Sequence, residues 1–123
     1  MSASSELLDE AVLNELRELS KELDQDVLGE VVTAYRKVAP ELLAQLEEAA
    51  TGRVFGVLAR AAHTLKGSSA QIGALPLREL ARELEADARA ERGDRIALLV
   101  SQCRTAWVEV DAALGRAVGE EKS

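Results

Sequence analysis

The chain of 123 residues contains only one cysteine and three aromatic residues, so neither disulfides nor aromatic packing can dominate its core. Its one cysteine, Cys103, excludes an internal disulfide, and we expect a buried, unreactive thiol. Its only aromatic residues are Tyr35, Phe55 and Trp107, so Ala, Leu and Val must form most of the core. Two prolines interrupt a composition rich in Ala, Glu, Leu and Arg, which is typical of helices.

Targeting and membrane-spanning patterns are also missing from the sequence. Residues 2–10 are polar and acidic, which predicts no signal peptide. No apolar run approaches the roughly 20 residues that cross a bilayer. The formal net charge is −7, and an acidic chain does not favour a nucleic-acid surface. We therefore expect a cytoplasmic protein that binds neither nucleic acid nor a membrane.

Apolar residues recur at helical spacing in five stretches of the chain. We expect helices over residues 5–20, 26–50, 53–73, 75–91 and 95–117. The joints between them are short, so consecutive helices should run antiparallel. The predicted fold is all-α: an antiparallel up-down four-helix bundle with an additional short N-terminal helix, in a single domain over residues 1–123.

Capping residues give the expected helix starts. Ser4 or Ser5 is expected to cap the first helix, Asp24 or Asp26 the second, and Asp94 the last.

Breaking residues give the expected kinks and helix ends. Pro40 falls inside the second predicted helix, where it removes the amide that would bond to the carbonyl of Arg36. We expect a kink there, and a break into two helices is the alternative. Thr51 and Gly52 should end that helix, and Gly73 should end the third.

The only histidine, His63, lies in the run AAHTLKGSSAQIG over residues 61–73. The core stripe of this predicted helix consists of Val54, Leu58, Ala61, Leu65, Ser68 and Ile72. At about 100° per residue, His63 lies about 180° from the centre of the stripe. We therefore expect the imidazole to face away from the core.

Small residues surround His63 on this predicted outer face, namely Gly56, Ala59, Gly67 and Ala70. Glycine inside a helix costs about 1 kcal/mol relative to alanine, so stability alone does not favour the two glycines. A cleared surface around one imidazole is useful when the backbone of another protein must approach it closely. An idle, solvent-exposed histidine is the alternative.

The run HTLKGSSAQIG resembles the signature of histidine-containing phosphotransfer (HPt) domains, which act in bacterial and fungal multistep phosphorelays. The flanking runs PELLAQLEEAA and LRELARELEADARAERGD resemble the neighbouring helices of that family, so the resemblance covers most of the chain. It implies a left-handed, mostly antiparallel four-helix bundle. It also implies that His63 accepts a phosphoryl group from the aspartate of one receiver domain and passes it to another.

The resemblance also implies roles for four further residues. By position, Lys66 and Gly67 correspond to the residues that support the phosphohistidine and make room for it. Glu85 stands where some members carry a glutamine that hydrogen-bonds the ring and others carry an acid. Arg89 stands where some members place a basic residue near the active histidine. Glu85, or water, could accept from the ring nitrogen and fix the tautomer, and the Lys66 ammonium could reach the phosphoryl oxygens.

Basic residues form a second stripe on the fourth predicted helix. It contains Arg78, Arg82, Glu85, Arg89 and Arg92 at spacings of three and four. If the stripe borders His63, it supplies positive potential on an acidic protein. The alternative is a solvated face on which these arginines pair with Glu79, Glu83 and Asp87.

The sequence has no glycine-rich phosphate loop, no nucleotide signature and no carboxylate cluster for Mg²⁺. We therefore expect a phosphocarrier without autokinase activity that binds no cofactor or metal, with Mg²⁺ and most catalytic groups supplied by the receiver. The expected partners are response-regulator receiver domains, one of which could belong to a hybrid sensor kinase, and the expected state is a monomer.

Two alternatives remain open. One is the phosphotransfer domain of a chemotaxis-type kinase, which receives its phosphoryl group from ATP through a kinase domain. No linker to such a domain is visible, so we expect a free-standing shuttle. The other is a structural bundle with an idle His63.

Overall fold

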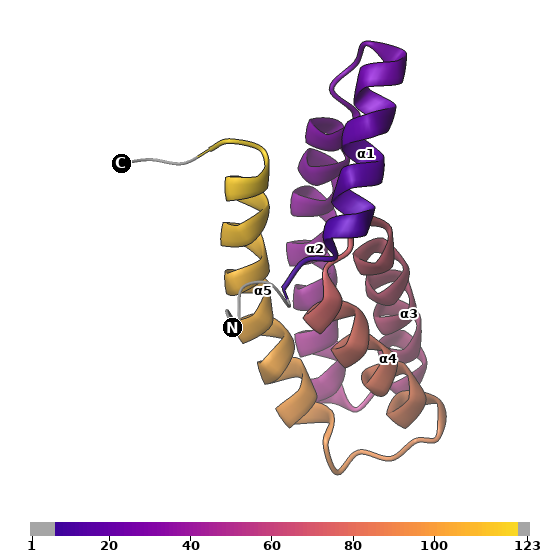
Figure 1. Ribbon diagram of the computed structural model, residues 1–123. Coiled ribbons are helices and arrows are strands. Elements are labelled where there is room, and N and C mark those ends of the chain that lie inside the picture. The colour runs from indigo at the N-terminus through magenta and orange to yellow at the C-terminus, as the bar shows by residue number, and fades with distance from the viewer. Residues whose placement is uncertain (1–6, 121–123) are drawn as a thin grey trace.

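The computed structural model describes residues 7–120, which form five helices (Figure 1). They are α1 (Glu10–Leu23), α2 (Val27–Gly52), α3 (Phe55–Ile72), α4 (Leu75–Arg89) and α5 (Ile96–Ala117). Helices α2 to α5 form a four-helix bundle, and α1 packs on α2 and α3 at one end of it. The predicted all-α bundle with an additional N-terminal helix is confirmed.

Helix α1 begins later than the predicted start. Asp9 caps it, and its side chain accepts a hydrogen bond from the N–H of Ala11 at 3.0 Å. The predicted caps Ser4 and Ser5 lie outside the described residues.

The residues just before α1 are extended and lie against the turn between α3 and α4. Leu8 forms an isolated antiparallel bridge with Ala74, and the N–H of Asp9 donates to the carbonyl of Gly73 at 2.8 Å. Both Leu8 and Ala74 are buried. A tertiary contact therefore replaces the helical turn that periodicity predicted at this position.

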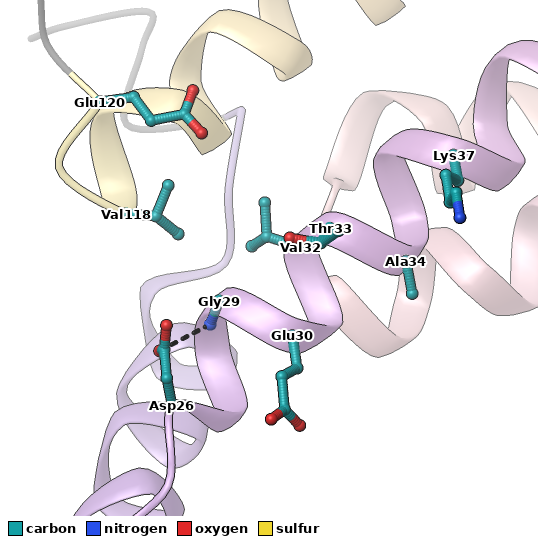
Figure 2. A pocket seen from close by; sticks show the side chains of 9 residues that line it. All are labelled: Asp26, Gly29, Glu30, Val32, Thr33, Ala34, Lys37, Val118 and Glu120. Atoms are coloured by element: carbon teal, nitrogen blue, oxygen red, sulfur yellow. Dashed lines mark hydrogen bonds between the residues drawn. The ribbon is translucent and has the colours of Figure 1, made fainter.

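The second helix is capped as predicted but ends later. Asp26 accepts from the N–H of Gly29 at 2.9 Å (Figure 2), whereas Asp24 adopts a left-handed conformation at the end of α1. Helix α2 continues through Pro40, so the alternative of two helices is wrong. Its end also falls later than predicted, because the left-handed residue that reverses the chain is Arg53, with φ 54°.

The predicted end of α3 is confirmed, whereas the predicted N-cap of α5 is wrong. Gly73 ends α3 with φ 78°, as predicted, because glycine adopts this conformation without steric cost. Asp94 does not cap α5. The N-cap is Arg95, which makes no side-chain capping bond there.

The core consists mainly of aliphatic side chains, and all five helices contribute to it. One polar contact crosses it: the hydroxyls of Tyr35 and Ser69 are 2.7 Å apart, which joins α2 to α3. The Tyr35 ring also packs edge-on against Trp107 of α5, with centroids 5.6 Å apart. Cys103 is buried as predicted, and burial raises the pKa of its thiol to about 12, which suppresses the reactive thiolate.

No helix within residues 7–120 combines the length and the apolar character that spanning a bilayer requires.

Candidate functional site

His63 lies near the middle of α3, with its side chain 62% exposed. The buried residues of this helix are Leu58, Ala59, Ala61, Ala62, Leu65, Ser69 and Ile72. The prediction was wrong for three positions: Val54 is exposed, Ser68 is half-buried, and Ala59 is buried instead of on the outer face. The buried face is therefore rotated towards His63, which stands beside the contact between α3 and α4.

The His63 ring is anchored by a buried carboxylate from α4. Its Nδ1 lies 2.9 Å from Oε2 of Glu85, whose side chain is only 9% exposed. A hydrogen bond from Lys66, with further bonds from Arg89 and His63, outweighs desolvation and lowers the pKa of Glu85 to about 2. An ionised carboxylate only accepts hydrogen bonds, so Nδ1 carries the proton and the Nε2 lone pair of the neutral ring is left free.

Two cations share the Glu85 carboxylate with His63. Lys66 Nζ lies 2.7 Å from Oε1. Arg89 approaches Oε2 through Nε at 3.0 Å and Nη2 at 2.7 Å. The structure therefore brings together four of the five predicted site residues around one carboxylate. The pairing of Lys66 with Glu85 was not predicted from the sequence.

Gly67 follows Lys66 on the exposed side of α3. A Cβ atom added at Gly67, or at Gly56 two turns before His63, would meet nothing within 4 Å. Neither glycine has a left-handed backbone, so the fold itself does not require glycine at these two positions. The result is an open surface on the His63 side of α3, which fits the expectation of close approach by another molecule.

A family model for the Hpt domain matches residues 30–116 of the chain, which include Glu85 and its polar partners His63, Lys66 and Arg89. The chain belongs to the Hpt domain family. The resemblance read from the HTLKGSSAQIG run is thus confirmed, and it gives this Hpt domain a histidine phosphotransfer role in a phosphorelay.

The fold of this Hpt domain is also similar to that of a solved structure, histidine-containing phosphotransfer protein B (HptB) from Pseudomonas aeruginosa PAO1. The two chains are 24% identical and superpose with a TM-score of 0.85, over 96% of this chain and 99% of the other. A search of curated proteins finds no match.

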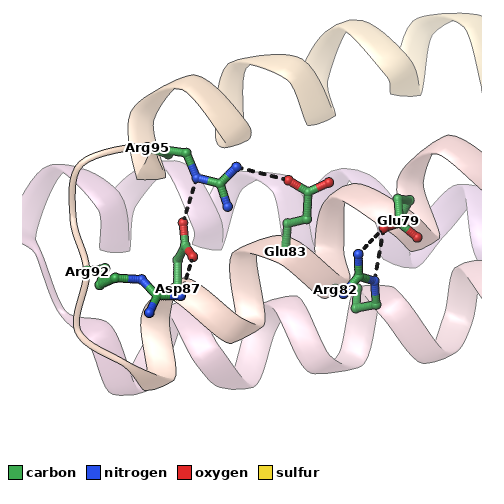
Figure 3. Close-up of polar contacts among 6 residues, drawn as sticks. All are labelled: Glu79, Arg82, Glu83, Asp87, Arg92 and Arg95. Carbon is green, nitrogen blue, oxygen red and sulfur yellow. Dashed lines mark hydrogen bonds and ion pairs between the residues drawn. The ribbon is translucent and has the colours of Figure 1, made fainter.

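The basic stripe of the Hpt domain does not gather at His63. Arg89 alone among its arginines contacts Glu85, while Arg82 pairs with Glu79, and Arg92 pairs with Asp87 at 3.1 Å (Figure 3). The solvated, paired alternative is therefore correct for Arg82 and Arg92.

A second buried carboxylate, Asp87, lies further along α4; the sequence named it as a partner of the arginines but did not predict its burial or its contact with Arg95. Asp87 accepts hydrogen bonds from Arg95 and Arg92, each at 3.1 Å (Figure 3). These contacts, that of Arg95 above all, lower the pKa of Asp87. Arg95 also reaches Glu83 at 3.3 Å, so the cluster fastens the start of α5 to α4. It is a structural cluster rather than part of the His63 site.

A surface hollow at the start of α2 is also separate from His63 (Figure 2). It is lined by Asp26, Gly29, Glu30, Val32, Thr33, Ala34, Lys37, Val118 and Glu120. No predicted site residue lines it. Among residues 7–120, no three His, Cys, Asp or Glu side chains are grouped so that they could hold a metal ion.

Glu85 should make the stability of the fold sensitive to acid. Its neighbours lower its pKa from the ordinary value of 4.5 to about 2 in the folded state, so its contribution is present above about pH 4.5 and is lost as the pH falls towards 2. In Glu85→Gln this contribution is absent at every pH. The difference in unfolding free energy between wild type and variant should therefore shrink across this interval.

Urea unfolding followed by Trp107 fluorescence measures this difference at each pH. The exposed Glu48 of α2 provides the control, because Glu48→Gln should reproduce the wild-type profile. A difference for Glu85→Gln that stays constant down to pH 2 would contradict the assignment.

Proposed function

We propose that Nε2 of His63 is the phosphoryl acceptor of a shuttle between two receiver domains. The observation that carries the proposal is the pairing of Nδ1 with buried Glu85, at 2.9 Å, which leaves Nε2 as the free nitrogen of a side chain that is 62% exposed. An exposed nucleophile held in one tautomer is what in-line phosphoryl transfer requires of the accepting side.

The transfer step balances on these atoms. The Nε2 lone pair forms a bond to phosphorus while the bond from phosphorus to the receiver's aspartate oxygen breaks, and the aspartate leaves with the electron pair. The proton stays on Nδ1, so the phosphorylated ring carries a positive charge opposite the Glu85 carboxylate. Delivery to the second receiver is the reverse of this step, with its aspartate as nucleophile.

The other parts of the reaction belong to the partner in this proposal. The receiver supplies Mg²⁺ and most catalytic groups, and the chain itself uses no cofactor and does not take phosphate from ATP. Lys66 and Arg89 provide positive charge at the Glu85 carboxylate that holds the His63 ring, and Gly67 leaves room for the receiver's loops. We propose a monomer that works in the cytoplasm, with the receiver of a hybrid sensor kinase as one candidate donor.

Replacing His63 with Gln should abolish phosphorylation, because the chain has no other histidine. The wild-type protein, incubated with a panel of labelled, phosphorylated receiver domains, should acquire an acid-labile, alkali-stable label from at least one. The variant should acquire none, with unchanged helical circular dichroism, since the side chain is exposed.

The same assay with labelled ATP and Mg²⁺ in place of a receiver should give no label on either protein. Persistent label on His63→Gln would remove His63 from the mechanism. Strong labelling of the wild-type protein from ATP alone would contradict the shuttle.

Gly67 should matter for docking and not for folding. Gly67→Ala should leave stability unchanged or raise it by up to about 1 kcal/mol, because the Cβ meets open space and alanine is the better helix former. Gly67→Gln should also fold, but its side chain would occupy space the receiver needs to bring the reacting atoms to about 3 to 3.5 Å.

We therefore expect slow transfer to Gly67→Gln from a phosphorylated receiver and a smaller change with phosphoramidate, a small donor. Gly56→Gln, two turns to the other side of His63, shows how far the contact surface extends. Wild-type rates with both donors for Gly67→Gln would contradict the steric role.

A further inference from the structure

Glu85 is bonded to two cations although one would neutralise it. Lys66 contacts Oε1, and Arg89 contacts Oε2, the oxygen that also faces Nδ1 of His63. Before His63 is counted, the group carries one net positive charge. The surplus positive charge stands beside the residue that the proposed function makes the phosphoryl acceptor.

The two cations differ in the geometry with which they hold the carboxylate. Arg89 lies on the same helix as Glu85, four residues on, and directs two N–H groups of its planar guanidinium at one oxygen. Lys66 lies on α3, three residues after His63, and offers a single ammonium on a flexible stem. Lys66 is therefore the cation that can leave Glu85 with the smaller loss of defined geometry.

Phosphorylation changes the charges around His63 and Glu85. The following step rests on the proposed function: a phosphoryl dianion arrives on Nε2, and the ring bearing the Nδ1 proton becomes positive. The dianion then attracts a cation, while Glu85 gains a positive ring as its neighbour and needs one cation less. Arg82, one turn before Glu85 on α4, already forms an ion pair with Glu79. Lys66 is one turn from His63, within reach of the phosphoryl oxygens.

We infer that Lys66 moves from Glu85 to the phosphoryl group when His63 is phosphorylated, and that Arg89 is a positioning residue that holds Glu85 while Lys66 is away. Without Arg89, Glu85 would retain Lys66. Loss of Arg89 should therefore act on the phosphoryl group indirectly, by withholding the lysine.

Phosphorus NMR of the protein phosphorylated with phosphoramidate, together with the rate of that phosphorylation, tests this exchange. Lys66→Gln should shift the phosphohistidine resonance and slow phosphorylation by about twofold to fivefold, the range of a partly exposed ion pair. Arg89→Gln should shift the resonance in the same direction and slow the reaction similarly. Arg89→Lys should restore much of the wild-type behaviour, and Arg82→Gln should behave as wild type.

The decisive comparison uses Glu85→Gln, which keeps an oxygen to accept from Nδ1 but has no charge to hold Lys66. In that background, adding Arg89→Gln should change neither the resonance nor the rate. An effect of Arg89→Gln that persists there would show that Arg89 acts on the phosphoryl group directly, and a wild-type resonance and rate for the single variant would show no coupling. Either result overturns the inference. Absence of phosphohistidine in the wild-type protein would instead overturn the proposed function.

Discussion

The buried carboxylate of Glu85 is the interaction on which the His63 site depends. A carboxyl group buried between two helices destabilises the contact unless its polar atoms are hydrogen-bonded and any charge on it is paired. Here it stays ionised because three donors surround it, two from α3 and one from α4. The bond from His63 that helps to pair the Glu85 charge also fixes the His63 ring. The same carboxylate therefore links α3 to α4 and orients the nucleophile.

In the proposed function this arrangement offers an acceptor, and the receiver supplies most of the catalytic groups. The side chains around His63 orient the ring and supply positive charge, while Gly67 and Gly56 leave the surface beside it open. The rest of the bundle holds α3 and α4 in register, and the Asp87 cluster fastens α5 to the same helix that carries Glu85.

Local sequence patterns predicted the helices well but not the contacts between them. Asp26 and Gly73 act as predicted because capping depends on neighbours in the sequence. The predicted start of α1 was wrong because Leu8 pairs with Ala74, which is distant in the sequence. Ala59 was placed on the wrong face because alanine, in a helix rich in small residues, does not indicate which side is buried.

In the candidate site too, the sequence predicted the residues better than the contacts between helices. His63 could be located from periodicity and from its motif, and the resemblance pointed to Lys66, Gly67, Glu85 and Arg89. Arg89 lies four residues after Glu85 on the same helix, a spacing at which side chains on a helix meet. The contact of Lys66 with Glu85 depends on the packing of α3 against α4, which no spacing within one helix reports. For the same reason Arg95 was not predicted as a partner of Asp87, because it reaches back from the start of another helix.

Nitrogen-15 NMR of the protein, labelled at its single histidine, is the most direct test of the claim that Glu85 holds the proton on Nδ1 and leaves Nε2 to react. The account predicts that the neutral ring carries its proton on Nδ1, and that after phosphorylation the coupling to phosphorus appears on Nε2. A proton on Nε2 in the neutral ring, or a phosphorus coupling on Nδ1, would contradict the claim that Glu85 sets which nitrogen of His63 reacts.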